Sequence, residues 1–158
     1  MRWTRAFAIA ILACVVVLTG ALPAGASTRS RVYRGETSQD HVIRFQVART
    51  DAGRRYLRQM DARNLTTTCE DGTIQSFGFG YGFGGPYVRI AEGGTFSFED
   101  VGPYGAFRLG GRLGSMSGEG TLSYAFPALT EDEQAQGCTT GDLTWTVEYV
   151  RTIIRPRF

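Results

Sequence analysis

An alternating run of aromatic residues and glycines is the stretch of this sequence that most suggests binding chemistry. Residues 76–87 read SFGFGYGFGGPY, so aromatic rings occupy every second position from Phe77 to Phe83. In a β-strand this spacing puts all four rings, Phe77, Phe79, Tyr81 and Phe83, on one face. Such a face is either buried in a core or exposed as a platform for sugar rings, an apolar ligand or a partner protein. We expect the core, and the binding alternatives stay open.

Four aromatic residues are the candidates if a ligand binds at the rim of that strand, where it meets glycine-rich loops. They are Tyr81, Phe83, Tyr87 and Tyr104. The glycines at 80, 82 and 85 also match the G-x-G-x-x-G pattern of dinucleotide sites. That site needs a helix to begin there, whereas Pro86 and a further strand follow. We therefore expect no cofactor.

Acid–base catalysis finds little support among the titratable residues. Acidic residues group at 70–71, 99–100 and 131–133, each in an expected turn or first helical turn, where carboxylates are favoured for local reasons. The single histidine, His41, falls at an expected strand start with no nucleophile pattern beside it. We expect no catalytic residue and no metal site. A small hydrolase using two carboxylates about 5–9 Å apart is kept as an alternative.

The N-terminal segment has the pattern of a secretory signal peptide. Two arginines precede an apolar run from Ala6 to Leu18, and Ala24-Gly25-Ala26 forms a small-x-small cleavage site. We expect cleavage after Ala26, which leaves a secreted β-domain at 27–158 with its core at about 32–150. The alternative is a membrane anchor through residues 6–22, because the apolar run approaches the spanning limit of about 17 residues. Without that segment no stable membrane insertion is expected.

The mature chain is electrically neutral as a whole. All 17 basic residues are arginine, and outside the signal peptide 15 arginines face 15 acidic residues. Arginine without lysine indicates a GC-rich, bacterial genome. Nucleic-acid binding requires a clustered basic face, so we expect no nucleic-acid partner. The local excess at Arg54, Arg55 and Arg58 is interpreted as a solvated strand face.

Two cysteines remain after the signal peptide is removed. An even number of cysteines in an exported chain predicts a disulfide between Cys69 and Cys138. Closing a loop of that length stabilises the fold by about 4 kcal/mol in the chain-entropy account. Two free thiols or half a metal site are the alternatives, and His41 is the only histidine that such a site could use.

Hydrophobic alternation with a period of two dominates the mature chain and predicts strands. Ile43, Phe45 and Val47 share one face of a strand, and residues 55–69 form a strand with a bulge or break near Asp61. In the last strand one face carries Leu143, Trp145, Val147 and Tyr149. Further strands are expected in the aromatic run and at 86–92, 95–99, 104–113 and 118–126.

These patterns together predict an all-β fold: an antiparallel β-sandwich or a flattened β-barrel of about eight to ten strands with one disulfide. A capping box of Thr130 and Glu133 adds one short helix near 131–136.

Five short motifs follow one another in a recognisable order: YRGETSQ at 33–39, CEDG at 69–72, GTFSF at 94–98, GEGTL at 118–122 and CTTGDLTW at 138–145. In this order the chain resembles a group of small exported all-β proteins of high-GC bacteria, over about residues 32–150. The resemblance implies an exported, disulfide-linked β-domain, and it implies no activity.

The sequence therefore predicts a secreted, non-enzymatic β-domain that binds a cell-wall component or glycan, a small apolar ligand or another protein outside the cytoplasm. A purely structural or interaction protein without a pocket is the alternative, beside the carboxylate hydrolase.

Overall fold

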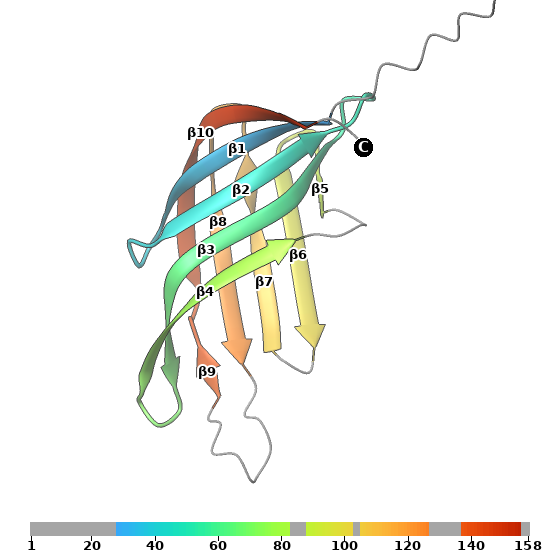
Figure 1. Ribbon diagram of the computed structural model, residues 1–158. Coiled ribbons are helices and arrows are strands. Elements are labelled where there is room, and N and C mark those ends of the chain that lie inside the picture. The colour runs from blue at the N-terminus through green and yellow to red at the C-terminus, as the bar shows by residue number, and fades with distance from the viewer. Residues whose placement is uncertain (1–27, 83–87, 103–104, 127–136, 156–158) are drawn as a thin grey trace, which may run out of the picture.

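The chain folds into one antiparallel sheet that closes on itself (Figure 1). The computed structural model describes residues 28–82, 88–102, 105–126 and 137–155, and within them every regular element is a strand. The strands are β1 (Thr28–Thr37), β2 (Val42–Arg49), β3 (Arg55–Cys69), β4 (Ile74–Gly82), β5 (Val88–Ile90), β6 (Thr95–Gly102), β7 (Gly105–Leu113), β8 (Ser117–Phe126), β9 (Cys138–Thr139) and β10 (Leu143–Arg155).

Six of these strands form a closed barrel. They follow the order β10–β1–β2–β3–β9–β8, and β10 pairs with β8 to complete the ring. β7 and β6 extend the sheet beyond β8, while β4 and β5 pair with the other edge of β3. Figure 1 shows β1 to β4 crossing in front of β6 to β8, which gives the barrel two layers. The expected all-β barrel is confirmed, and the helix expected at 131–136 lies outside the described residues.

The predicted alternation determines which faces point inward. Ile43, Phe45 and Val47 of β2 are buried, as are Leu143 and Trp145 of β10. The bulge expected in β3 is also present, because the register with β4 shifts between Ala62 and Leu65, where Asn64 has a positive φ of 58°. A bulge of this kind bends a strand and increases its twist, which helps the sheet to close.

Trp145 lies at the centre of the barrel core and is 1 % exposed. Its ring centroid lies 4.8 Å from that of Phe45 and 6.1 Å from that of Phe96. Two glycines that pair across β7 and β8, Gly111 and Gly120, make room for the indole. A Cβ on either glycine would lie 2.5 Å from Cζ2 of Trp145, closer than any side chain tolerates.

The T-S-Q segment after β1 joins the first hairpin to two other strands. The side-chain amide of Gln39 donates to the carbonyl of Thr66 and accepts from its N–H, both at 2.9 Å. The N–H of Ser38 donates to the carbonyl of Thr144 at 2.8 Å, and its hydroxyl accepts from the Thr144 N–H at 3.3 Å. Thr66 lies between the part of β3 that pairs with β2 and the part that pairs with β9. The side-chain amide of Gln39 therefore supplies the backbone of Thr66 with the hydrogen bonds that a neighbouring strand supplies elsewhere along β3.

The predicted disulfide between Cys69 and Cys138 is present and joins residues that face each other across β3 and β9. It secures the point where the short strand β9 bridges β3 and β8 to complete the barrel wall.

In the described chain, three hairpins and the β5–β6 connection use the same tight turn, in which the fourth residue adopts a positive φ. Each shows the same pair of backbone hydrogen bonds, as in Asp40 N–H to Thr37 C=O and Thr37 N–H to His41 C=O. This is a type I turn followed by a left-handed residue, a position that favours glycine. Glycine occupies it in three of the four turns, whereas the β1–β2 turn places Asp40 there with a φ of 60°.

We predict that Gly120→Ala destabilises the protein by about 3 kcal/mol, because the new methyl would overlap the backbone of β7 at Gly110 and the indole of Trp145. The matched control is Gly78→Ala, where a Cβ would meet nothing within 4 Å. The control should change the free energy of unfolding by less than about 1 kcal/mol. Urea denaturation followed by tryptophan fluorescence measures both variants. Equal stabilities would show that the glycine pocket does not limit packing at Trp145.

Candidate functional site

The described part of the aromatic row packs against the protein. Phe77, Phe79 and Tyr81 of β4 are half-buried and lie on the core cluster. Ring centroids are 4.8 Å apart between Phe79 and Phe107, and 5.1 Å apart between Tyr81 and Phe98. These rings cover the face of β6, β7 and β8, so they form a second aromatic cluster and not an open shelf.

Of the four aromatic residues predicted to bind a ligand, the structure describes Tyr81 alone; Phe83, Tyr87 and Tyr104 lie outside the described residues. The Tyr81 hydroxyl donates a hydrogen bond to Oδ2 of Asp100 at 2.5 Å. Burial, together with this hydrogen bond and the negative charge of Asp100, raises the pKa of Tyr81 to about 12. Both ring and hydroxyl of Tyr81 are thus engaged within the protein.

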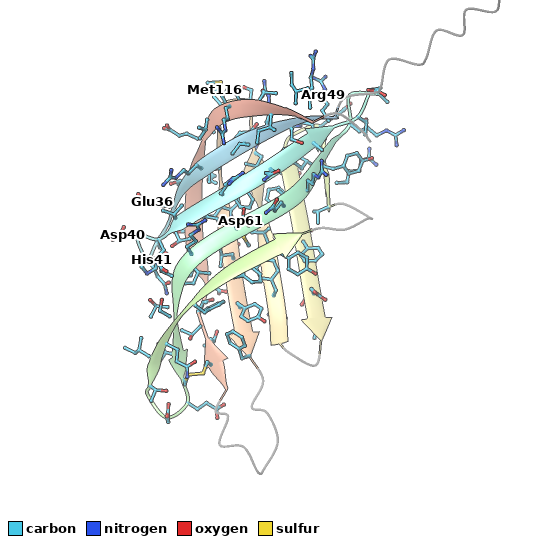
Figure 2. The ribbon with its side chains drawn as sticks, in the orientation of Figure 1. Glu36, Asp40, His41, Arg49, Asp61 and Met116 are labelled. Atoms are coloured by element: carbon cyan, nitrogen blue, oxygen red, sulfur yellow. A yellow bond between two sulfur atoms is a disulfide. The ribbon has the colours of Figure 1, made fainter. Side chains whose placement is uncertain are left out.

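One end of the barrel collects arginine side chains around an open hollow of about 830 Å³, which we call the barrel mouth. Val47 and Ile90 provide apolar lining. Of the described residues that line the mouth, Glu92 alone is acidic, and Asp51 follows in the β2–β3 turn. Figure 2 shows Arg49 at this end of the molecule, far from Asp40 and His41. The arginines that line the mouth are Arg29, Arg31, Arg49, Arg54, Arg55 and Arg89.

Two of these six arginines have a structural role. Arg31 donates to the carbonyl of Ser115 and Arg55 to that of Leu113, each at 3.0 Å, which holds the β7–β8 hairpin over the mouth. In the described part of the chain the only ion pair joins Arg108 to Glu99, at 2.8 Å. The other four arginines of the mouth make no side-chain hydrogen bond or ion pair with the described part of the chain; they are Arg29, Arg49, Arg54 and Arg89. The mouth therefore has a high local positive charge.

A second hollow, of about 570 Å³, lies on the outer face of β1, β2 and β3, and we call it the outer groove. Figure 2 shows Asp61 on β3 in the middle of this face, with Asp40 and His41 at the β1–β2 turn. Valines at 32, 42 and 150 supply its apolar lining. Its charged side chains are Arg34, Arg44, Arg63, Arg151, Asp40 and Asp61.

The acidic groups predicted from sequence serve local roles where the structure describes them. Asp71 accepts hydrogen bonds from the hydroxyl and N–H of Thr73 at 2.6 and 2.8 Å, which hold the pKa of Asp71 below its usual range. The turn expected at 99–100 is wrong, because Glu99 and Asp100 lie within β6 and pair with β7. Glu99 forms an ion pair with Arg108, and Asp100 accepts from Tyr81. None of these acidic residues lines the outer groove, whereas Asp40 and Asp61 do.

Among the described residues no group of His, Cys, Asp or Glu is arranged to hold a metal ion. No helix in that part of the chain is long and apolar enough to span a membrane. Comparison of the chain with protein-family models, curated proteins and solved structures finds no match. The candidate sites therefore depend on the geometry of this chain alone.

Sequence reasoning missed both hollows because their residues come from separated segments. The mouth draws arginines from four segments between Arg29 and Arg89, and the balance of 15 arginines and 15 acidic residues over 27–158 hides their convergence. One signal was available, since arginines flank the turn of the β2–β3 hairpin at 49 and 54–55. The residues on either side of a hairpin turn lie next to each other, so these three positive charges must lie close together.

We predict that one tyrosine of the native protein titrates with a midpoint of about 12 and that Tyr81→Phe removes it. Because this pKa lies above the unfolded value of about 10, the neutral phenol contributes stability at lower pH and loses it as the pH rises through 12. Asp100→Asn removes the negative charge and should lower the midpoint. Rapid-mixing ultraviolet difference spectra measure the titration. Normal titration of every tyrosine near pH 10 would contradict this account.

Proposed function

We propose that the chain is an exported, non-enzymatic binding module that holds an anionic polymer of the cell surface at the barrel mouth. The observation that carries this proposal is the convergence of six arginines, four of them without a side-chain partner in the described chain, around one hollow. Guanidinium groups bind phosphate and carboxylate groups through two parallel hydrogen bonds, so several free arginines suit a ligand with repeated negative charges.

The strands bring these arginines together at one end of the barrel. Arg49, Arg55 and Arg89 extend from neighbouring strands, and Arg55 is anchored to Leu113. The acidic residues of the β3–β4 turn and of β6 lie toward the opposite end of the sheet (Figure 1). Residues 27–158, which carry no net charge, thereby acquire one strongly basic end, which attracts anions over a distance of about a Debye length.

The lining of the mouth favours a polymer recognised through its charges. Among the residues that the structure describes, none of those that line the mouth is aromatic. Proteins that grip single-stranded nucleic acids combine basic grooves with aromatic side chains for base stacking. A small apolar ligand has less support, because the described rings of β4 pack against the protein. A phosphate- or carboxylate-rich wall polymer matches the mouth and the expected export of the chain.

Fluorescence anisotropy with labelled inorganic polyphosphate tests this proposal. The wild-type protein should bind, and four arginine contacts should reduce the affinity about 50-fold between 50 and 200 mM salt. The triple variant Arg49→Gln/Arg54→Gln/Arg89→Gln should lose at least about tenfold in affinity at low salt, and its salt slope should fall by about two.

The matched control is the triple variant Arg34→Gln/Arg63→Gln/Arg151→Gln, which removes the same charge from the outer groove. It should retain the affinity for polyphosphate. Equal losses in both triple variants, or no binding at 50 mM salt, would overturn the proposal. Tighter binding of oligothymidylate of equal charge would assign the mouth to nucleic acid instead.

A further inference from the structure

A row of charged side chains crosses the outer face of the barrel, and its two central members have the same sign. Glu148, Arg34, Arg44 and Asp61 stand opposite one another on β10, β1, β2 and β3. Like charges directly opposite on paired strands destabilise a sheet. The flanking acids do not relieve this by direct pairing, since the only ion pair in the described chain is that of Arg108 with Glu99.

The guanidinium of Arg44 is poorly satisfied by the protein. Its Nε is buried and has no hydrogen-bond partner, although the side chain as a whole is half-buried. The nearest acid in the row, Asp61, accepts from the amide of Gln59 at 2.9 and 3.2 Å. A buried charged donor without an acceptor is costly. The half-buried side chain of Arg44 also lines the outer groove, where an external anion can offset the positive charge of the same guanidinium.

Backbone strain is concentrated at the same groove. Asp40 and Asn64 are the only non-glycine residues in the described chain with positive φ, and both line the outer groove. The equivalent position in the other three turns of this type is glycine, which carries no such penalty. Strained residues cluster at binding sites because the surrounding structure holds their side chains in place.

We propose that the outer groove binds a small hydroxylated acid, a sugar bearing a carboxylate or a phosphate ester. Its anionic group would lie between Arg34 and Arg44, where it offsets the repulsion of these two cations. The carboxylates of Asp40 and Asp61 accept hydrogen bonds from sugar hydroxyls, and the valines contact the C–H face of the ring. The volume of about 570 Å³ is that of a typical small-molecule site. This site is independent of the polymer site at the barrel mouth.

Isothermal titration calorimetry with three probes tests this inference: glucuronate, glucose 6-phosphate and uncharged glucose. At least one acid should bind with a Kd of about 1 mM or tighter, and glucose should not bind. Arg34→Gln alters an exposed residue and should weaken binding by at least about tenfold. Arg44→Gln should weaken it at least as much, with near-UV circular dichroism confirming that the fold is intact.

The triple variant Arg49→Gln/Arg54→Gln/Arg89→Gln serves as the control and should bind the acid as the wild type does. The inference is overturned if neither acid binds the wild-type protein, if glucose binds equally well, or if the control loses binding while Arg34→Gln keeps it. Failure of polyphosphate binding would leave these results unaffected, so the two proposals are tested separately.

Discussion

The pairing of β10 with both β1 and β8 is the constraint on which the rest of the structure depends. Trp145 faces Thr37 of β1 on one side and Gly120 of β8 on the other. The sheet can close there because Gly120 and its partner Gly111 carry no side chain where the indole lies. A fully buried indole contributes a large apolar area, and the glycines let it lie against the backbone of both strands. The strand pairing that closes the barrel is thus also the place where the core residue Trp145 is buried.

This closure determines how the remaining side chains are used. One group of aromatic rings forms the barrel core around Trp145, and a second group lies beneath β4. Along β3, the side-chain amide of Gln39 bonds to the backbone of Thr66, and the disulfide links Cys69 to Cys138. Apolar contacts and backbone ladders hold the fold together, and among the arginines of the mouth only Arg31 and Arg55 add hydrogen bonds to it. The arginine charges remain available at the mouth and in the outer groove, where a rigid wall keeps like charges close together.

Much of the fold could be predicted from the sequence, because strand faces follow local alternation and the cysteine count is small. The buried faces of β2 and β10, the bulge in β3 and the Cys69–Cys138 bond are all as expected. The strand β1 was not recognised, because its residues 28–37 carry several charges and a glycine pressed against β10. The outer groove could not be predicted, since it depends on the register that places Arg34 opposite Arg44. For the mouth, the sequence offered only the arginines on either side of the β2–β3 turn.

The central claim is that one barrel presents two separate sets of arginines without ion-pair partners in the described chain. Arginine Nε–H signals in a ¹⁵N-labelled protein test it most directly, with polyphosphate and glucuronate added in turn. The account predicts that polyphosphate shifts the signals of Arg49, Arg54 and Arg89 and that glucuronate shifts those of Arg34 and Arg44. Shifts of all arginines by both ligands, in proportion to their exposure, would contradict it.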